Sequence, residues 1–91
     1  MAMNRKPGED LVEKGLDDMA HGRETIESLL VAIGAPRLRG IGLPIPDDLP
    51  ATPEHRLYFL LQETHGDDAH SQYNALIRRL VSYERAAECG L

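Results

Sequence analysis

The side chains best suited to binding a metal ion lie close together in one short segment, at His65, Asp67 and His70. Histidine nitrogens and carboxylate oxygens are ligands for divalent cations such as zinc and manganese, and a turn leading into a helix can present both. The spacing matches no zinc motif, because no two histidines stand four residues apart with a glutamate between them and no cysteine pair is present. We therefore favour the interpretation that Asp67 or Asp68 caps the next helix. A metal-dependent regulatory module is the alternative.

A second group of side chains could bind an anion or the acidic surface of a partner. Its members are arginines, whose planar guanidinium groups match carboxylates and phosphates: Arg37, Arg39, Arg78 and Arg79. Arginines more often pair with exposed carboxylates of the same chain, such as Glu84 and Glu88, and these pairs contribute little to stability. The sequence favours such internal pairs, and an anion-dependent regulatory module is the alternative.

Nothing in the sequence indicates an enzyme. It contains no glycine-rich phosphate loop and no nucleophile elbow. Its single cysteine, Cys89, lies near the C-terminal end with no histidine beside it. A reactive thiol needs an electropositive setting, and the sequence offers only Arg85 one helical turn earlier. We expect no catalytic residues and no cofactor.

Residues 57–80 predict a helix, a turn at Gly66 and a second helix, so DNA binding is another alternative. The second helix would offer four polar side chains to base edges: Ser71, Gln72, Asn74 and Arg78. Gln62 opposes this reading, because a tight helix-turn-helix usually has a small residue four positions before the turn glycine. The net charge of −5 is also unfavourable for contacts with phosphates, although it is compatible with a local basic patch. We favour an ordinary antiparallel hairpin, with a small DNA-binding regulator or antitoxin-like protein as the alternative.

The composition is that of a small globular protein, with 91 residues of which 42% are hydrophobic and 27% are charged. This length predicts one domain, residues 1–91, in which residues 1–8 form a flexible N-terminus. The longest uninterrupted apolar run covers residues 29–33, far short of the ~20 residues that a membrane span needs. One cysteine cannot form an internal disulfide, which is typical of a reducing compartment. We expect a soluble cytoplasmic protein with no membrane partner.

Apolar spacing predicts one long helix over residues 11–33. The apolar positions recur at alternating intervals of four and three residues when Arg23 is counted as a placeholder. Gly34 followed by Pro36 is a typical helix end. Glycine costs a helix about 1 kcal/mol relative to alanine, so Gly22 could divide this one. Because the spacing keeps its phase across Gly22, we expect one continuous helix that is at most bent there.

A strap of residues 34–53 follows, rich in glycine and proline, and it cannot form a continuous helix. Its apolar residues Ile41, Leu43 and Ile45 alternate with other residues, as in an extended segment that lays one side on a core. The strap is too apolar for a linker exposed to water. We expect it to join two helical halves and to cover apolar surface.

A helical hairpin is expected after the strap. Thr52 followed by Pro53 is a favourable helix start, and this helix runs to about Thr64. The turn covers residues 65–68, and the last helix ends at Gly90. That helix carries two parallel apolar stripes, which is more apolar surface than one neighbouring helix can cover.

These elements predict an all-α fold, a small bundle of three to four helices with a long N-terminal helix, the strap and a C-terminal hairpin. The surplus apolar surface predicts a non-catalytic interaction protein. It would be a homodimer or an accessory subunit that binds a larger protein through an apolar helix face. The expected partner-binding residues are Tyr73, Leu76, Ile77, Leu80, Tyr83, Leu43 and Ile45.

Overall fold

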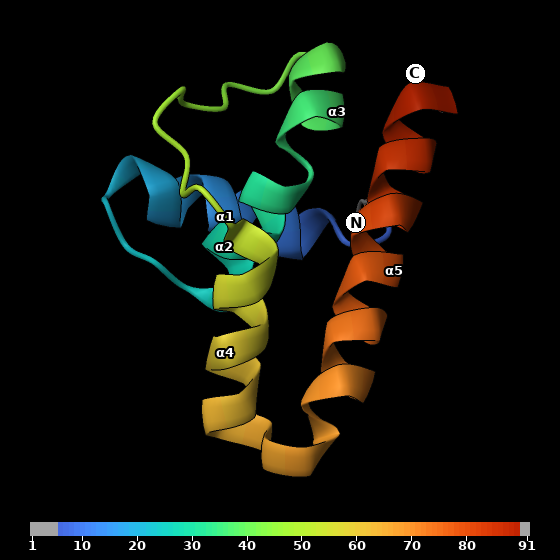
Figure 1. The fold of residues 1–91 in the computed structure, drawn as a ribbon. Coiled ribbons are helices and arrows are strands. Elements are labelled where there is room, and N and C mark those ends of the chain that lie inside the picture. Colours follow the sequence, from blue (N-terminus) through green and yellow to red (C-terminus); the bar gives the residue numbers. More distant parts are fainter. Residues whose placement is uncertain (1–5, 90–91) are drawn as a thin grey trace.

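The chain folds into helices alone, which confirms the all-α prediction. The computed structural model describes residues 6–89, and this range contains helices and no strand. The elements are α1 (Glu9–Ala20), α2 (Ile26–Ile33), α3 (Ala35–Gly40), α4 (Pro53–His65), the 3-10 turn η1 (Gly66–Asp68) and α5 (Ala69–Cys89). Figure 1 shows α4 and α5 as a hairpin, with α1 and α2 across its open end and α3 beside the C-terminal half of α5. Within the described range, no helix has the length and apolar character needed to cross a membrane.

The single long helix expected over residues 11–33 is wrong, because the chain turns between α1 and α2. Gly22 has a φ of 70°, in the left-handed region that favours glycine. Thr25 then caps α2: its hydroxyl accepts a hydrogen bond from the Ser28 N–H, and the Ser28 hydroxyl accepts one from the Thr25 N–H. The apolar spacing keeps its phase across the turn because both helices face the same core.

A buried carboxylate fixes this turn. Asp18 is 2% exposed and accepts hydrogen bonds from Lys14 Nζ at 2.7 Å, Arg23 Nε at 3.0 Å and Thr25 Oγ1 at 2.6 Å. These donors belong to α1, to the turn and to the cap of α2, so one side chain joins three segments. The hydrogen bond from Lys14, followed by those from Thr25 and Arg23, holds the pKa of Asp18 well below its usual range.

We expect acid to destabilise the fold partly through Asp18. The folded pKa lies below the ordinary value of 3.8, so on acidification the unfolded chain takes up this proton first, and stability falls below a pH of about 4. Asp18→Asn should remove this contribution and lower the denaturation midpoint at neutral pH, because an amide cannot accept all three hydrogen bonds. Urea denaturation followed by circular dichroism, repeated from neutral to strongly acidic pH, measures both effects. Identical pH dependence in the two proteins would contradict this role.

The strap is not one continuous helix, as expected, although its first residues are helical. Its first residues form α3, in which Pro36 occupies the first turn, where a missing N–H leaves no hydrogen bond unmade. The expected alternation is present further on. Ile45 is buried, and Ile41 and Leu43 pack against the core while partly exposed. The strap therefore covers one side of the core.

The expected C-terminal hairpin is confirmed. Helix α4 starts at Pro53, with Thr52 at the cap position, but the Thr52 hydroxyl accepts no capping hydrogen bond from a backbone N–H. Asp67 and Asp68 form the 3-10 turn. The Asp68 carboxylate accepts a hydrogen bond from Gln72 Nε2 at 2.9 Å, not from a backbone N–H as a capping residue would. Helix α5 then continues directly from this turn.

Two expectations concern the chain ends. Gly90, the expected end of the last helix, lies outside the described residues, as do residues 1–5 of the expected flexible N-terminus. Residues 6–8 are held in place. The Lys6 N–H donates to the Glu9 carboxylate at 2.9 Å, and Gly8 lies so close to α5 that a Cβ there would be 2.6 Å from the Arg79 carbonyl oxygen.

The core surrounds α2, which packs against α1, α4 and α5. The residues of α2 from Ser28 to Ala32 are all buried. The apolar core consists of Val12, Leu29, Leu30, Val31, Ala35, Leu38, Ile45, Leu57, Leu61, Ala69, Leu80, Tyr83 and Ala87. One side of α5 thus belongs to the core, whereas Ile77 and Val81 on the neighbouring side are partly exposed.

Candidate functional site

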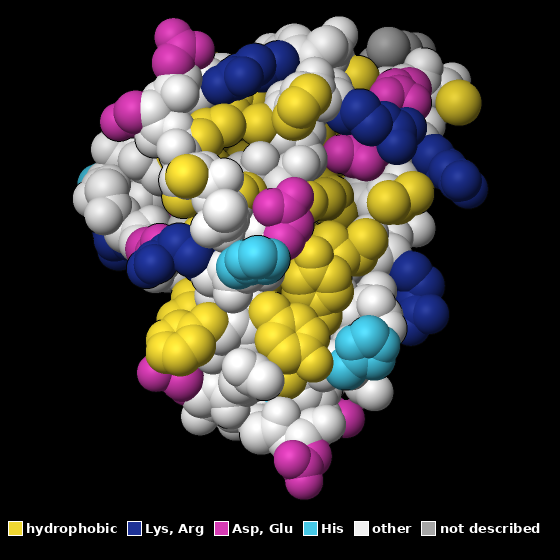
Figure 2. Space-filling model, viewed as in Figure 1, with side chains coloured by type: hydrophobic (Ala, Val, Ile, Leu, Met, Phe, Trp, Pro, Cys, Tyr) yellow, Lys and Arg dark blue, Asp and Glu magenta, His cyan; other side chains and the backbone are white. Residues whose placement is uncertain are grey.

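An apolar groove lies between the α2–α3 junction and α5. Ile33 and Pro36 line one wall, Ile77 and Val81 line the other, and the buried Leu80 lies at the base. Its volume is about 320 Å³. Figure 2 shows hydrophobic side chains as a band that runs along the hairpin toward this region. The wall residues are partly or fully exposed, so another molecule can reach them.

Gly34 sets how closely the two walls approach each other. A Cβ at this position would lie 2.8 Å from Glu84 Oε2 and 3.1 Å from the methyl carbons of Leu80. A larger residue would have to displace these side chains. The glycine that ends α2 therefore also allows the α2–α3 junction to pack closely against α5.

Charged side chains from both walls close one end of the groove. Arg37 donates to the Glu88 carboxylate through Nε at 3.1 Å and Nη2 at 2.7 Å, and its Nη1 lies 3.2 Å from Glu84 Oε1. Glu84 is 3% exposed; burial raises its pKa, and the positive charge of Arg37 opposes that rise. The hydrogen bonds from Arg37 lower the pKa of Glu88. This end of the groove is an internal ion-pair network.

We expect Glu84→Gln to raise the free energy of unfolding at neutral pH. Because burial raises the folded pKa above the ordinary 4.5, the folded chain keeps this proton to higher pH than the unfolded chain does. Stability therefore falls as the pH rises from 4.5 through the folded pKa, and the neutral amide avoids that loss. Urea denaturation between pH 4 and pH 8 measures the change. A less stable variant at neutral pH would show that pairing with Arg37 outweighs the cost of burial.

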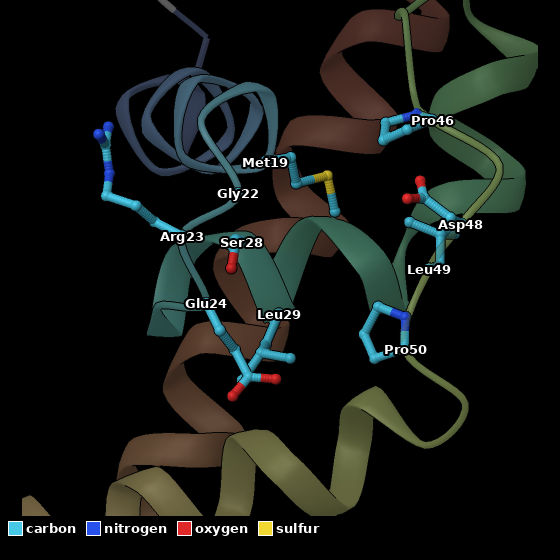
Figure 3. A pocket seen from close by; sticks show the side chains of 10 residues that line it. All are labelled: Met19, Gly22, Arg23, Glu24, Ser28, Leu29, Pro46, Asp48, Leu49 and Pro50. Carbon is cyan, nitrogen blue, oxygen red and sulfur yellow. The ribbon is translucent and has the colours of Figure 1, made fainter.

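A second, smaller hollow of about 210 Å³ lies between the α1–α2 turn and the strap. Met19 and Leu29 are among the apolar residues that line it. In Figure 3 the Arg23 side chain extends away from the other labelled side chains. Arg23 pairs with carboxylates of α1, and Glu24 pairs with Arg56. Since these charged groups are already engaged, the hollow offers a ligand less than the groove does.

Comparisons with protein-family models, with curated proteins and with solved structures found no match to this chain. Apolar walls favour an apolar ligand surface, and two facing walls favour an elongated one.

The structure brings few of the expected partner-binding residues to this site. Leu80, Tyr83 and Ile45 are buried and hold the core together, and Leu80 also lies at the base of the groove; partner binding by these residues stays a prediction. The others are partly exposed: Leu43, Tyr73 and Leu76 pack against the core, and Ile77 lines the groove. The Tyr73 ring also packs on the Tyr58 ring, with their centroids 5.8 Å apart.

Three apolar wall residues of the groove were missing from the expected partner-binding set: Ile33, Pro36 and Val81. Val81 stands four residues after Ile77, so it belongs to the second apolar stripe of the last helix, and that stripe was the available signal. Ile33 and Pro36 come from a distant part of the sequence. Only the packing of the α2–α3 junction beside α5 shows that they share a site.

Phe59 is the exposed large hydrophobic side chain of the described range, with 59% of its surface accessible. Its neighbours one turn away on α4 are polar: His55, Arg56, Gln62 and Glu63. A single exposed apolar side chain is common on protein surfaces. Phe59 therefore marks no site by itself.

The expected metal site is not assembled. Within residues 6–89, no three histidine, cysteine, aspartate or glutamate side chains come together in a way that could hold a metal ion. His65 belongs to the end of α4 and His70 to the start of α5, so the 3-10 turn separates them. With Asp67 in that turn, all three are exposed.

The expected anion site is also dispersed. Arg37, Arg39 and Arg79 each pair with a carboxylate of the chain, as the interpretation of internal pairing predicted. Arg78 differs, since it is exposed and makes no ion pair with any residue from 6 to 89.

The candidate DNA-reading side chains lie on the first half of α5. Gln72 and Asn74 bond to Asp68 and His70, which occupies part of their hydrogen-bonding capacity. Ser71 is exposed. DNA binding by the hairpin remains a separate prediction, and a gel shift with mixed duplex DNA at low salt tests it.

Proposed function

We propose that this chain is a non-catalytic helical interaction protein, an accessory or regulatory subunit that binds one α-helix of another protein in the groove. The observation that carries the proposal is the groove itself, in which Ile33, Ile77 and Val81 remain partly exposed on two facing walls. An amphipathic helix fills such a groove with apolar side chains spaced three and four residues apart. Covering this surface would contribute about 25 cal/mol per Å² of apolar area removed from water.

The exposed surface of the helices favours a partner of different sequence over a second copy of this chain. In the described residues, the apolar sides of α1, α2 and α4 face the core. Apart from the groove region, a second copy would present only the isolated Phe59 of α4 and partly buried apolar side chains of the hairpin. We also propose a cytoplasmic location, because the single exposed thiol of Cys89 is typical of a reducing compartment, and we assign no cofactor.

Val81→Asp tests this proposal, because it places a charge in a groove wall while leaving the core unchanged. Gln62→Glu is the control: Gln62 is exposed on α4 and is outside the groove lining, so this variant adds one negative charge away from the groove. The tagged wild type and both variants would be used to capture proteins from the native source. We expect a protein that is retained by the wild type and by Gln62→Glu to be lost with Val81→Asp. Thermal melting should show that all three chains are folded.

Sedimentation equilibrium of the purified chain distinguishes a partner from a second copy. We expect a monomer over the accessible concentration range. A wild-type dimer that Val81→Asp dissociates would make a second copy the occupant. Retention of the same proteins by the wild type and both variants would exclude the groove as the binding site.

A further inference from the structure

Among the arginines of residues 6–89, two exposed ones on α5 lack the internal ion-pair partners that the others have. The paired arginines are Arg23, Arg37, Arg39, Arg56 and Arg79. Arg78 and Arg85 make no ion pair with any residue that the structure describes. In a chain with a net charge of −5, most positive charges thus have a carboxylate partner nearby, and these two do not.

Both of these arginines border the groove. Arg78 precedes Val81 by three residues and Arg85 follows it by four, and these spacings place side chains on one side of a helix. Two helical turns separate the arginines, about 10 Å along the axis. Figure 2 shows dark blue side chains along the outer edge of α5, beside the hydrophobic band. The groove therefore has apolar walls and a positive outer edge.

We infer that the helix bound in the groove carries carboxylates along the edge that meets Arg78 and Arg85. The inference rests on the proposed function and specifies the chemistry of the partner. A guanidinium group binds a carboxylate through two parallel hydrogen bonds, so each arginine offers a directional contact. Aspartate or glutamate residues seven positions apart, on a helix aligned with α5, match the spacing of the two arginines. The ion pairs would fix the orientation of the partner helix, while the apolar walls supply most of the affinity.

A nucleic acid fits this surface less well. Phosphates would meet the same two arginines, but the side chains between them and the opposite wall are apolar, as Ile77, Val81 and Ile33 show. The net charge of −5 would repel a polyanion over the remaining surface.

Two synthetic helical peptides test the inference. Both carry the same leucine stripe at intervals of three and four residues; one has glutamates seven residues apart along one edge, and the other has lysines there. Binding to the full chain is measured by fluorescence anisotropy at low and at high salt. We expect the glutamate peptide to bind roughly tenfold more tightly at low salt, with a smaller difference at high salt.

The double variant Arg78→Glu/Arg85→Glu should reverse the preference in favour of the lysine peptide. Arg79→Glu is the matched control, because Arg79 is adjacent in sequence but faces Asp10, and it should preserve the wild-type preference. Both arginines in the double variant are exposed, so thermal melting should show a folded chain.

The outcomes separate this inference from the proposed function. If both peptides bind the wild type equally and Val81→Asp abolishes the binding of both, the groove is supported as the binding site. The inferred acidic edge of the partner helix is then wrong. If neither peptide binds, the acidic edge is likewise overturned, and the capture experiment with Val81→Asp decides the groove independently. If duplex DNA binds in a way that depends on Arg78 and Arg85, and the chain shows no preference between the peptides, the inference is wrong. The ligands of the two arginines would then be phosphates instead of carboxylates.

Discussion

Gly15→Ala is expected to lower the free energy of unfolding by about 2 kcal/mol or more, although alanine normally favours a helix by about 1 kcal/mol over glycine. Gly15 is buried where α1 crosses α2. A Cβ there would lie 2.4 Å from Val31 Cγ2 and 2.5 Å from the Glu27 carbonyl oxygen. Because one of these atoms belongs to the backbone, a side-chain rotation cannot relieve the contact, and the two helices must move apart.

Urea denaturation followed by circular dichroism measures this loss. Gly40→Ala is the matched control, because Gly40 also lies in a helix but a Cβ there would meet no atom within 4 Å. The free energy of unfolding of this control should stay within about 1 kcal/mol of the wild-type value. A Gly15→Ala variant as stable as the wild type would show that α1 and α2 do not approach so closely.

Leu57→Ala is expected to lower the free energy of unfolding by about 2–5 kcal/mol. Leu57 is fully buried in α4, the helix through which the hairpin packs against α2. The substitution removes apolar contacts and leaves a cavity that the surrounding side chains fill only in part. Small domains have a total stability of about 5–15 kcal/mol, so this single change should shift the denaturation midpoint strongly.

Phe59→Ala provides the comparison on the same helix. Phe59 is a larger apolar side chain only two positions further, but more than half of it is exposed. Its removal should change stability by no more than about 0.5 kcal/mol. Equal losses for the two variants would mean that the face of α4 assigned to the core is wrong.

The groove gives α5 two different roles on adjacent sides. Leu80 and Tyr83 belong to the core, whereas Ile77 and Val81 face the groove. Leu80→Asp would consequently unfold the chain, and its effect on binding could not be separated from that on folding. Val81→Asp acts on the exposed side, which is why it is the informative variant for function.

The sequence by itself determined the helical class, the end of α2 at Gly34, the start of α4 at Pro53 and the hairpin that follows. Each of these depends on residues within a few positions of one another. Helical spacing, a proline in the first turn and a glycine at a helix end act through local backbone geometry, so they are visible in a single stretch of sequence.

The tertiary structure decided the turn at Gly22, the role of Asp18 and which stripe of α5 is left uncovered. A continuous helix and two helices that face one core give the same apolar spacing, so the pattern could not distinguish them. Asp18 is buried only because Lys14, Arg23 and Thr25 converge on it once the chain turns. The two stripes of α5 are similar in sequence, and they differ because α1, α2 and α4 pack against one of them and leave the other facing the groove.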